Sequence, residues 1–220
     1  RPSCDNQPPS GRSKKRLQFH LQVQIDGTPL VTITGSFPVP VCRFARAPRC
    51  KETDFELAFE VAYGYDELAR QAFYGLQAHM AVSWPGVIRS AKLAPANVSD
   101  VEMAPEVLFG ARGWALADRN CCGPDPAEKL KRDDTVLLVP LESKTYKNTP
   151  FPPNLTHMRR RIETVIGQLV GRFNAKKVWA TGRWHAVSRW LREMTSHTMA
   201  VLLCRRQGLP PLRFAELIDD

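Results

Sequence analysis

Two carboxylates, Asp118 and Glu163, are the residues of this chain best able to do chemistry together. Asp118 directly follows the apolar run 113–117, and Glu163 lies in the helix-patterned stretch 154–173, of which it is the only acidic residue. Two or three carboxylates in one cleft can hold a pair of divalent ions about 3.5 to 4 Å apart, which activate a water or hydroxyl at a phosphodiester. Oxygen ligands select Mg²⁺ or Mn²⁺ over zinc.

Glu163 also has a purely structural interpretation. It follows Ile162, a member of the apolar stripe of its helix, and therefore lies about 100° round the helix from the stripe, at the border between core and solvent. Arg159 precedes it by one turn, so an exposed i,i+4 ion pair is the alternative to metal binding.

Basic and imidazole side chains around these carboxylates could hold a nucleic acid. Arg159 and Arg160 could grip phosphates, because the guanidinium fork matches phosphate geometry. His79 is a candidate for contact with DNA or a metal, with a hydrogen-bonded structural histidine as the alternative. The remaining candidates are Lys14, Lys15 and Arg16, which could contact DNA or form a solvated tail. His197 is expected to pack in a helix.

The elements that must position these residues follow from periodicity and turn signals. Residues 21–25 and 30–34 have β character, and Pro38 and Pro40 should end the second run because proline is not tolerated inside a central strand. Residues 54–70 are interpreted as a loop with a short helix. The other predicted elements are a hairpin of strands 73–83 and 87–94, a helix opened by the capping box Ser99–Glu102, strands 113–117 and 135–141, and helices 124–132, 154–173 and 184–206.

This order predicts an α/β fold with a ribonuclease H-like mixed sheet. Three antiparallel strands come first, parallel strands joined by helical crossovers follow, and a helical extension ends the chain. Ligands of such sheets bind beyond the carboxyl ends of the strands, where Asp118 lies. A strand-end Asp and a helical Glu can therefore meet in one cleft.

Composition limits the class of protein. The chain has 220 residues, 43% of them hydrophobic, and a net charge of +9, which favours a polyanionic partner. No apolar run is long enough to span a bilayer, so a membrane is not an expected partner. Six cysteines without C-x-x-C spacing indicate reduced thiols rather than zinc or disulfides. Residues 1–28 are predicted to be a flexible basic tail and residues 29–220 the catalytic domain.

Several segments together resemble bacterial insertion-sequence transposases of the DDE type. They are SFPVPVC (36–42), FYGLQAH (73–79), APAN (94–97), ADR (117–119) and RRRIETVIGQLV (159–170). The resemblance implies a ribonuclease H-like catalytic domain with Asp118 and Glu163 as the second and third acidic metal ligands. It further implies Mg²⁺ or Mn²⁺ as cofactor and insertion-sequence ends and target DNA as partners. A homodimer, a bacterial cytoplasmic, nucleoid-associated location and an N-terminally truncated chain are further expectations.

One departure from the family pattern concerns chemistry directly. The first catalytic Asp of the family precedes the SFPVPVC segment, and this chain has Gly35 there. Asp26 is the nearest substitute, but it would need a bulge or slipped register to reach the same cleft. We therefore predict a transposase whose DNA cleavage and strand transfer are impaired. The alternatives are a catalytically inactive DNA-binding derivative and a stand-alone ribonuclease H-like nuclease.

Overall fold

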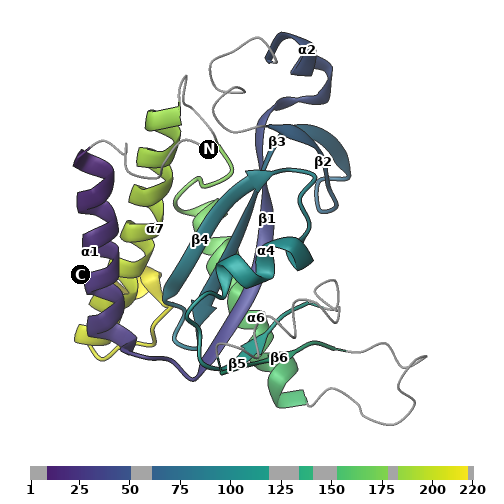
Figure 1. Ribbon diagram of the computed structural model, residues 1–220. Coiled ribbons are helices and arrows are strands. Elements are labelled where there is room, and N and C mark those ends of the chain that lie inside the picture. Colours follow the sequence, from purple (N-terminus) through teal and green to yellow (C-terminus); the bar gives the residue numbers. More distant parts are fainter. Residues whose placement is uncertain (1–8, 51–60, 119–133, 141–152, 178–182, 218–220) are drawn as a thin grey trace, which may run out of the picture.

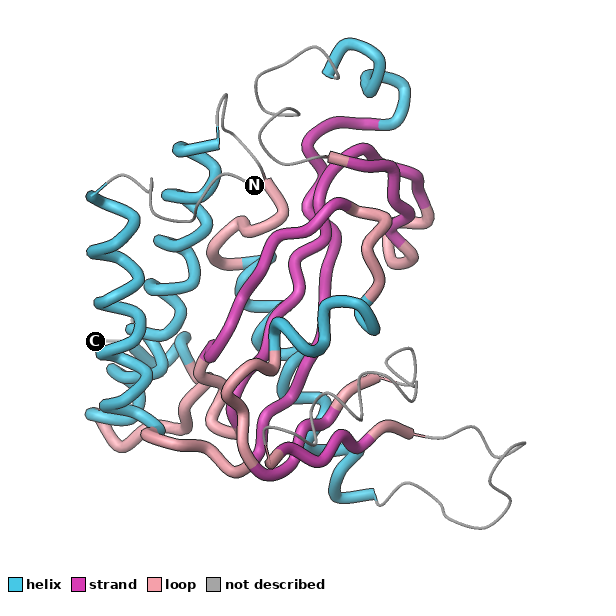
Figure 2. The backbone as a smooth tube through the Cα atoms, viewed as in Figure 1, coloured by secondary structure: helices cyan, strands magenta, loops and turns pink. Residues whose placement is uncertain are grey.

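A six-stranded mixed sheet forms the centre of the protein (Figures 1 and 2). The computed structural model describes residues 9–50, 61–118, 134–140, 153–177 and 183–217. The strands are β1 (Val31–Arg43), β2 (Ala62–Asp66), β3 (Gln71–Ser83), β4 (Ile88–Pro95), β5 (Gly113–Leu116) and β6 (Thr135–Leu138). The helices are α1 (Pro9–Asp26), α2 (Ala47–Cys50), α4 (Asp100–Val107), α6 (Pro153–Gly171) and α7 (Arg183–Arg206), with 3-10 turns at Phe44–Arg46 and Phe214–Leu217.

The sheet has the predicted mixture of antiparallel and parallel strands. Its order is β2-β3-β1-β5-β6, and β4 pairs with β3 beside β2. β3 is antiparallel to β1, β2 and β4, whereas β5 is parallel to β1 and to β6. This arrangement is compatible with a ribonuclease H-like fold. The predicted hairpin, the strands at 113–117 and 135–141, the Ser99 capping box and the helices at 154–173 and 184–206 are confirmed, whereas the helix predicted at 124–132 lies outside the described residues.

Helices pack against both faces of the sheet. The apolar stripe of α6, including Val165 and Leu169, packs against Ile33 and Phe37 of β1 in the largest core cluster. On the other face, Val107 and Leu108 at the end of α4 pack with Ala81 and Ala115. Alternate residues of β1 therefore point to α6 and to α4, so each functional side chain on this strand belongs to one of two separate environments.

The N-terminal segment is helical, so the strand predicted at 21–25 is wrong. Leu21 and Ile25 are buried and Val23 is exposed, which follows the helical rather than the alternating period. α1 lies beside α7 (Figure 1), and Gln22 donates from Nε2 to the carbonyl of Ile88 at 2.6 Å. α1 thus covers the edge of β4, which local sequence could not reveal. Residues 9–16, predicted to be a mobile tail, belong to the same helix, while the domain boundary at 28/29 stays a prediction.

β1 runs through Pro38 and Pro40, which the sequence predicted would end it. Leu30 accepts a hydrogen bond from the amide of Trp114, so the backbone groups of even-numbered β1 residues face the β5 side. Among the described residues, β5 pairs with β1 only as far as Ile33. The prolines therefore lack their N–H on a side of β1 where no ladder bond to a described strand is lost. A second correction is β2, which occupies part of the ambiguous stretch 54–70.

Candidate active site

Gly35 and Asp118 lie on neighbouring strands at the same level. In the parallel pair β1/β5, Ile33 lies opposite Leu116, and each is followed two residues later by Gly35 or Asp118. The ladder from β5 to β6 continues through Ala117, whose amide donates to Leu138 at 3.1 Å. Because side chains alternate along extended strands, positions 35 and 118 share the face covered by α6. A carboxylate at position 35 would start beside that of Asp118.

Ile162 of α6 occupies the space next to Gly35. A Cβ added at Gly35 would lie 2.9 Å from Ile162 Cγ1, 3.5 Å from its Cγ2 and 3.6 Å from Ile166 Cδ1. Ile162 is 4% exposed and belongs to the main core cluster. Apolar atoms therefore fill the position where the side chain of a first carboxylate would begin.

Arg159 binds Asp118 in an ion pair. Its Nη1 donates to Asp118 Oδ1 at 2.6 Å, and the Asp118 side chain remains 49% exposed. Glu163 is exposed one helical turn after Arg159, so both side chains project from the same side of α6. The i,i+4 pair predicted as the alternative role of Glu163 is not formed, because Arg159 reaches across to β5. The structure thus brings the helical turn carrying Glu163 to the end of the strand carrying Asp118.

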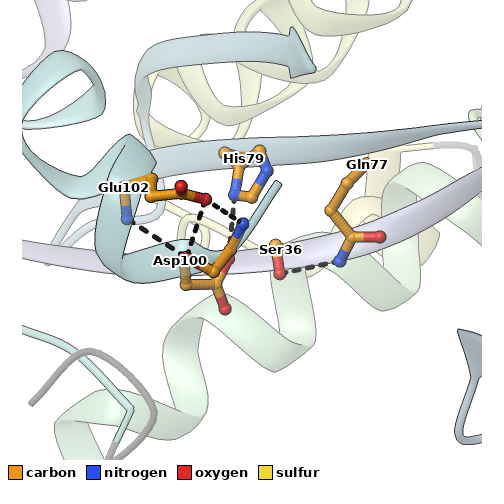
Figure 3. Close-up of polar contacts among 6 residues, drawn as sticks. Ser36, Gln77, His79, Asp100 and Glu102 are labelled. Carbon is orange, nitrogen blue, oxygen red and sulfur yellow. Dashed lines mark hydrogen bonds and ion pairs between the residues drawn. The ribbon is translucent and has the colours of Figure 1, made fainter. Parts of the chain in front are cut away.

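His79 belongs to a polar network on the opposite face of the sheet (Figure 3). Its ring is 3% exposed, and Nδ1 donates to Asp100 Oδ1 at 2.8 Å. Asp100 is the first residue of α4 and also accepts a hydrogen bond from Ser36. Burial alone would raise the pKa of Asp100, but the bonds from His79 and Ser36 outweigh it and lower that pKa. The hydrogen-bonded structural role of His79 agrees with this geometry, and a ring so deeply buried presents no atom to DNA.

The predicted basic residues differ in their accessibility. Lys15 and Arg16 are exposed on α1 and Arg160 is exposed on α6. Lys14 is half-buried, because its Nζ donates to the carbonyl of Ser188 at 3.2 Å and to the Ser188 hydroxyl. Lys14 therefore ties α1 to α7, and its availability to DNA is lower than the sequence suggested.

Asp26 does not take the place of a carboxylate at position 35. It ends α1 and faces Arg89 of β4, where its charge acts to raise the Arg89 pKa against the larger lowering effect of burial. In the sheet, β4 is separated from β5 by β3 and β1. Asp26 is therefore remote from Asp118, although the sequence argument, which required a bulge or a slipped register, assumed an extended chain where the structure has the end of a helix.

A comparison with protein families decides the affiliation of this fold and site. A family model described as "Transposase DDE domain" matches residues 27–176, more than half of the chain. The chain belongs to this DDE transposase family. Searches of curated proteins and of solved structures give no match. Membership of this transposase family implies DNA as a partner. None of the helices in the described part of the chain combines the length and apolar character needed to cross a bilayer.

DDE transposase domains generally use divalent metal ions, but the described residues of this transposase do not complete such a centre. Gly35 offers no side-chain ligand, Ile162 fills the adjoining space, and Asp118 is bound by Arg159. Within the described ranges, no group of three or more His, Cys, Asp or Glu side chains is placed to hold a metal ion. Asp118 and Glu163, the ligands that the resemblance predicts, would by themselves be a partial ligand set.

Sequence reasoning missed three tertiary contacts: one beside Gly35, one on the opposite face of the sheet, and one between α6 and the residue after β3. The closeness of Ile162 to Gly35 and the Asp100 partner of His79 are tertiary contacts between distant segments. The third is Arg161, whose guanidinium lies 4.7 Å from the centre of the Trp84 ring and whose pKa is lowered by burial. A local signal existed only for Asp100, because an acidic residue in the first turn of a helix is favoured by the helix dipole, but that signal did not indicate the contact with His79.

Proposed function

We propose that this chain is a DDE transposase catalytic domain that binds DNA and whose own strand cleavage and strand transfer are impaired. The observation that carries the proposal is Gly35 on β1 at the level of Asp118 on β5. A carboxylate shared by two ions stabilises the transition state through charge. A loss of ~4 kcal/mol of this stabilisation slows the chemical step roughly 10³-fold.

Exposed cations support DNA as the partner. Lys15 and Arg16 on α1 and Arg160 beside the candidate centre are open to solvent, and the chain carries a charge of +9. Phosphate contacts by such side chains release counterions, so the affinity for DNA should fall steeply as the salt concentration rises. In a plot of the logarithm of the association constant against the logarithm of the salt concentration, each contact should contribute a slope of about −0.9. We propose insertion-sequence ends and target DNA as the ligands, Mg²⁺ or Mn²⁺ as the ion used by intact relatives, and the bacterial cytoplasm as the location. A homodimer stays a prediction.

The first experiment measures binding and cleavage of the unaltered chain. We expect fluorescence anisotropy to show salt-dependent binding to duplex DNA. With Mn²⁺, we expect slow residual cleavage by the wild type that Asp118→Asn and Glu163→Gln abolish, because these two carboxylates would carry the activity that remains. Gly27→Asp is the control for a change of charge away from the candidate centre. A side chain added there meets no atom within 4 Å and adds an exposed carboxylate, so this variant should cleave DNA as the wild type does. A wild-type cleavage rate of about 1 s⁻¹ or more, within the ordinary enzymatic range, would refute the impairment.

The second candidate function is a DNA-binding derivative without any strand chemistry. It is favoured by the Asp118–Arg159 pair, in which an arginine neutralises a carboxylate that would otherwise face an ion. The two candidates differ in residual Mn²⁺-dependent cleavage, which only the impaired enzyme retains. If the wild type fails to bind DNA at low salt, both candidates are wrong.

A further inference from the structure

Gly35 is one of two described strand glycines, with Gly64 of β2, whose close neighbours are side-chain rather than backbone atoms and whose φ is not positive. Gly75, also on a strand, faces backbone atoms of Val39 and Pro40, so a side chain there would collide with the sheet itself. Gly113 and Gly86 have positive φ angles, which favour glycine for backbone reasons. Gly35 has neither constraint. Its nearest neighbours are side-chain atoms of a helix that packs on the sheet, chiefly Ile162.

The contact with Ile162 is too close for any side chain at position 35. A separation of 2.9 Å between carbon atoms is well inside the usual contact of about 3.5 to 4.0 Å. Cγ1 lies close to the helix backbone, so a rotation about the end of the side chain does not remove it. Ile162 is also β-branched, which limits it largely to one rotamer in a helix. Relief therefore requires a shift of α6 or a residue at position 162 that does not hold a γ carbon against position 35, either because it is smaller or because it lacks the β-branch.

The surrounding core resists such a shift. Val165 and Leu169 on the same stripe are fully buried against the sheet, and Arg159 holds the outer side of α6 to Asp118. Close-packed interiors transmit strain rather than absorb it. The packing of α6 against β1 therefore requires a residue without a side chain at position 35.

We propose that Ile162 is a second determinant of this centre, which prevents position 35 from carrying a metal ligand even when a carboxylate is restored there. This inference rests on the proposed function and deepens it. A metal ligand at position 35 would require two substitutions, one at Gly35 and one at Ile162. Gly35→Asp alone should leave metal affinity low. Gly35→Asp combined with Ile162→Ala should place a second carboxylate beside Asp118 without overlap.

Packing is tested first, without metal or DNA. We expect Gly35→Ala to lower the urea midpoint of the wild type and to lower it less, or raise it, in Ile162→Ala. Leu169→Ala is the matched control, since it removes the same number of carbons from the same buried stripe two turns away. In the Leu169→Ala background, Gly35→Ala should lower the urea midpoint as much as it does in the wild type. An equal cost in all three backgrounds would overturn the proposal.

Metal binding is tested next, by electron paramagnetic resonance titration with Mn²⁺ alone. We expect Gly35→Asp/Ile162→Ala to bind Mn²⁺ at least about tenfold more tightly than Gly35→Asp, which corresponds to ~1.4 kcal/mol. Gly35→Asp/Leu169→Ala should bind like Gly35→Asp. Equal affinity of all three would refute the role of Ile162. If Ile162→Ala does not fold, Ile162→Leu, which keeps the volume and removes the β-branch, should shift affinity in the same direction, and no shift would also refute it. Neither readout depends on wild-type DNA binding or cleavage, so failure here leaves the proposed function standing.

Discussion

The two faces of β1 use polar side chains in opposite ways. On the α4 face, His79 and Asp100 are joined by a hydrogen bond and Ser36 adds a second one to Asp100. On the α6 face, Gly35 has no side chain, and the charged groups Asp118 and Glu163 are half or fully open to solvent.

This difference separates structural groups from groups available for chemistry. A buried polar group is costly unless its partners are in place, so the α4 network should carry stability. Charges at the α6 face keep much of their hydration, so removing one costs little folding free energy. A charged residue at the α6 face can therefore change while the fold persists.

The largest effect is expected from breaking the α4 network. His79→Ala should destabilise the protein by about 3 kcal/mol, because it removes a buried partner and leaves the Asp100 carboxylate less compensated. Urea unfolding at pH 7 measures the change. His157→Ala, an exposed histidine on α6, is the control and should stay within about 0.5 kcal/mol. A change of about 0.5 kcal/mol or less for His79→Ala would show that the His79–Asp100 network does not stabilise the fold.

A smaller effect concerns pH and the second buried histidine. His197 is fully buried, with Nε2 at 3.1 Å from Gln168 Oε1, and burial lowers its pKa to about 3. Its folded pKa lies below the unfolded value, so the unfolded chain takes up a proton first as pH falls below about 6.5. We expect stability to drop by about 2 kcal/mol between pH 8 and pH 5.

His197→Phe should flatten this part of the pH profile in urea unfolding, because phenylalanine does not titrate. Asp100 does not interfere, since its lowered pKa places its loss of stability below pH 4. A wild-type profile that is flat from pH 8 to pH 5 would show that His197 can be protonated inside the fold.

The smallest effect is expected at the candidate centre. Asp118→Asn should change the free energy of unfolding by less than about 1 kcal/mol, since the ion pair with Arg159 is partly exposed. A double-mutant cycle with Arg159→Gln isolates the coupling, and 0.5 M salt should weaken it further. A coupling as large as the His79 effect would mean that the two faces of β1 do not differ in the way proposed.

The local sequence pattern was sufficient to predict a helix or hairpin whose defining contacts lie within that element. The stripe of α6 and the capping box Ser99–Glu102 were predicted because the contacts that define them lie within a few residues. Prediction failed at residues 21–25, where Leu21, Val23 and Ile25 fit an alternating strand as well as a helix. The contact with α7 and the edge of β4 decided between the two. The same applies to Pro38 and Pro40, which are tolerated because the described part of β5 pairs with β1 only as far as Ile33.

The sequence by itself determined the family, most of the described strands and helices from residue 71 onward, and the identities of Asp118, Glu163 and Gly35. These follow from residue identity and short-range periodicity. Only the tertiary structure decided that Gly35 stands level with Asp118, that Arg159 binds that carboxylate, and that Ile162 fills the neighbouring space. Such contacts join segments up to 127 positions apart, from Gly35 to Ile162. They depend on how a helix packs against a sheet, which no local sequence pattern specifies.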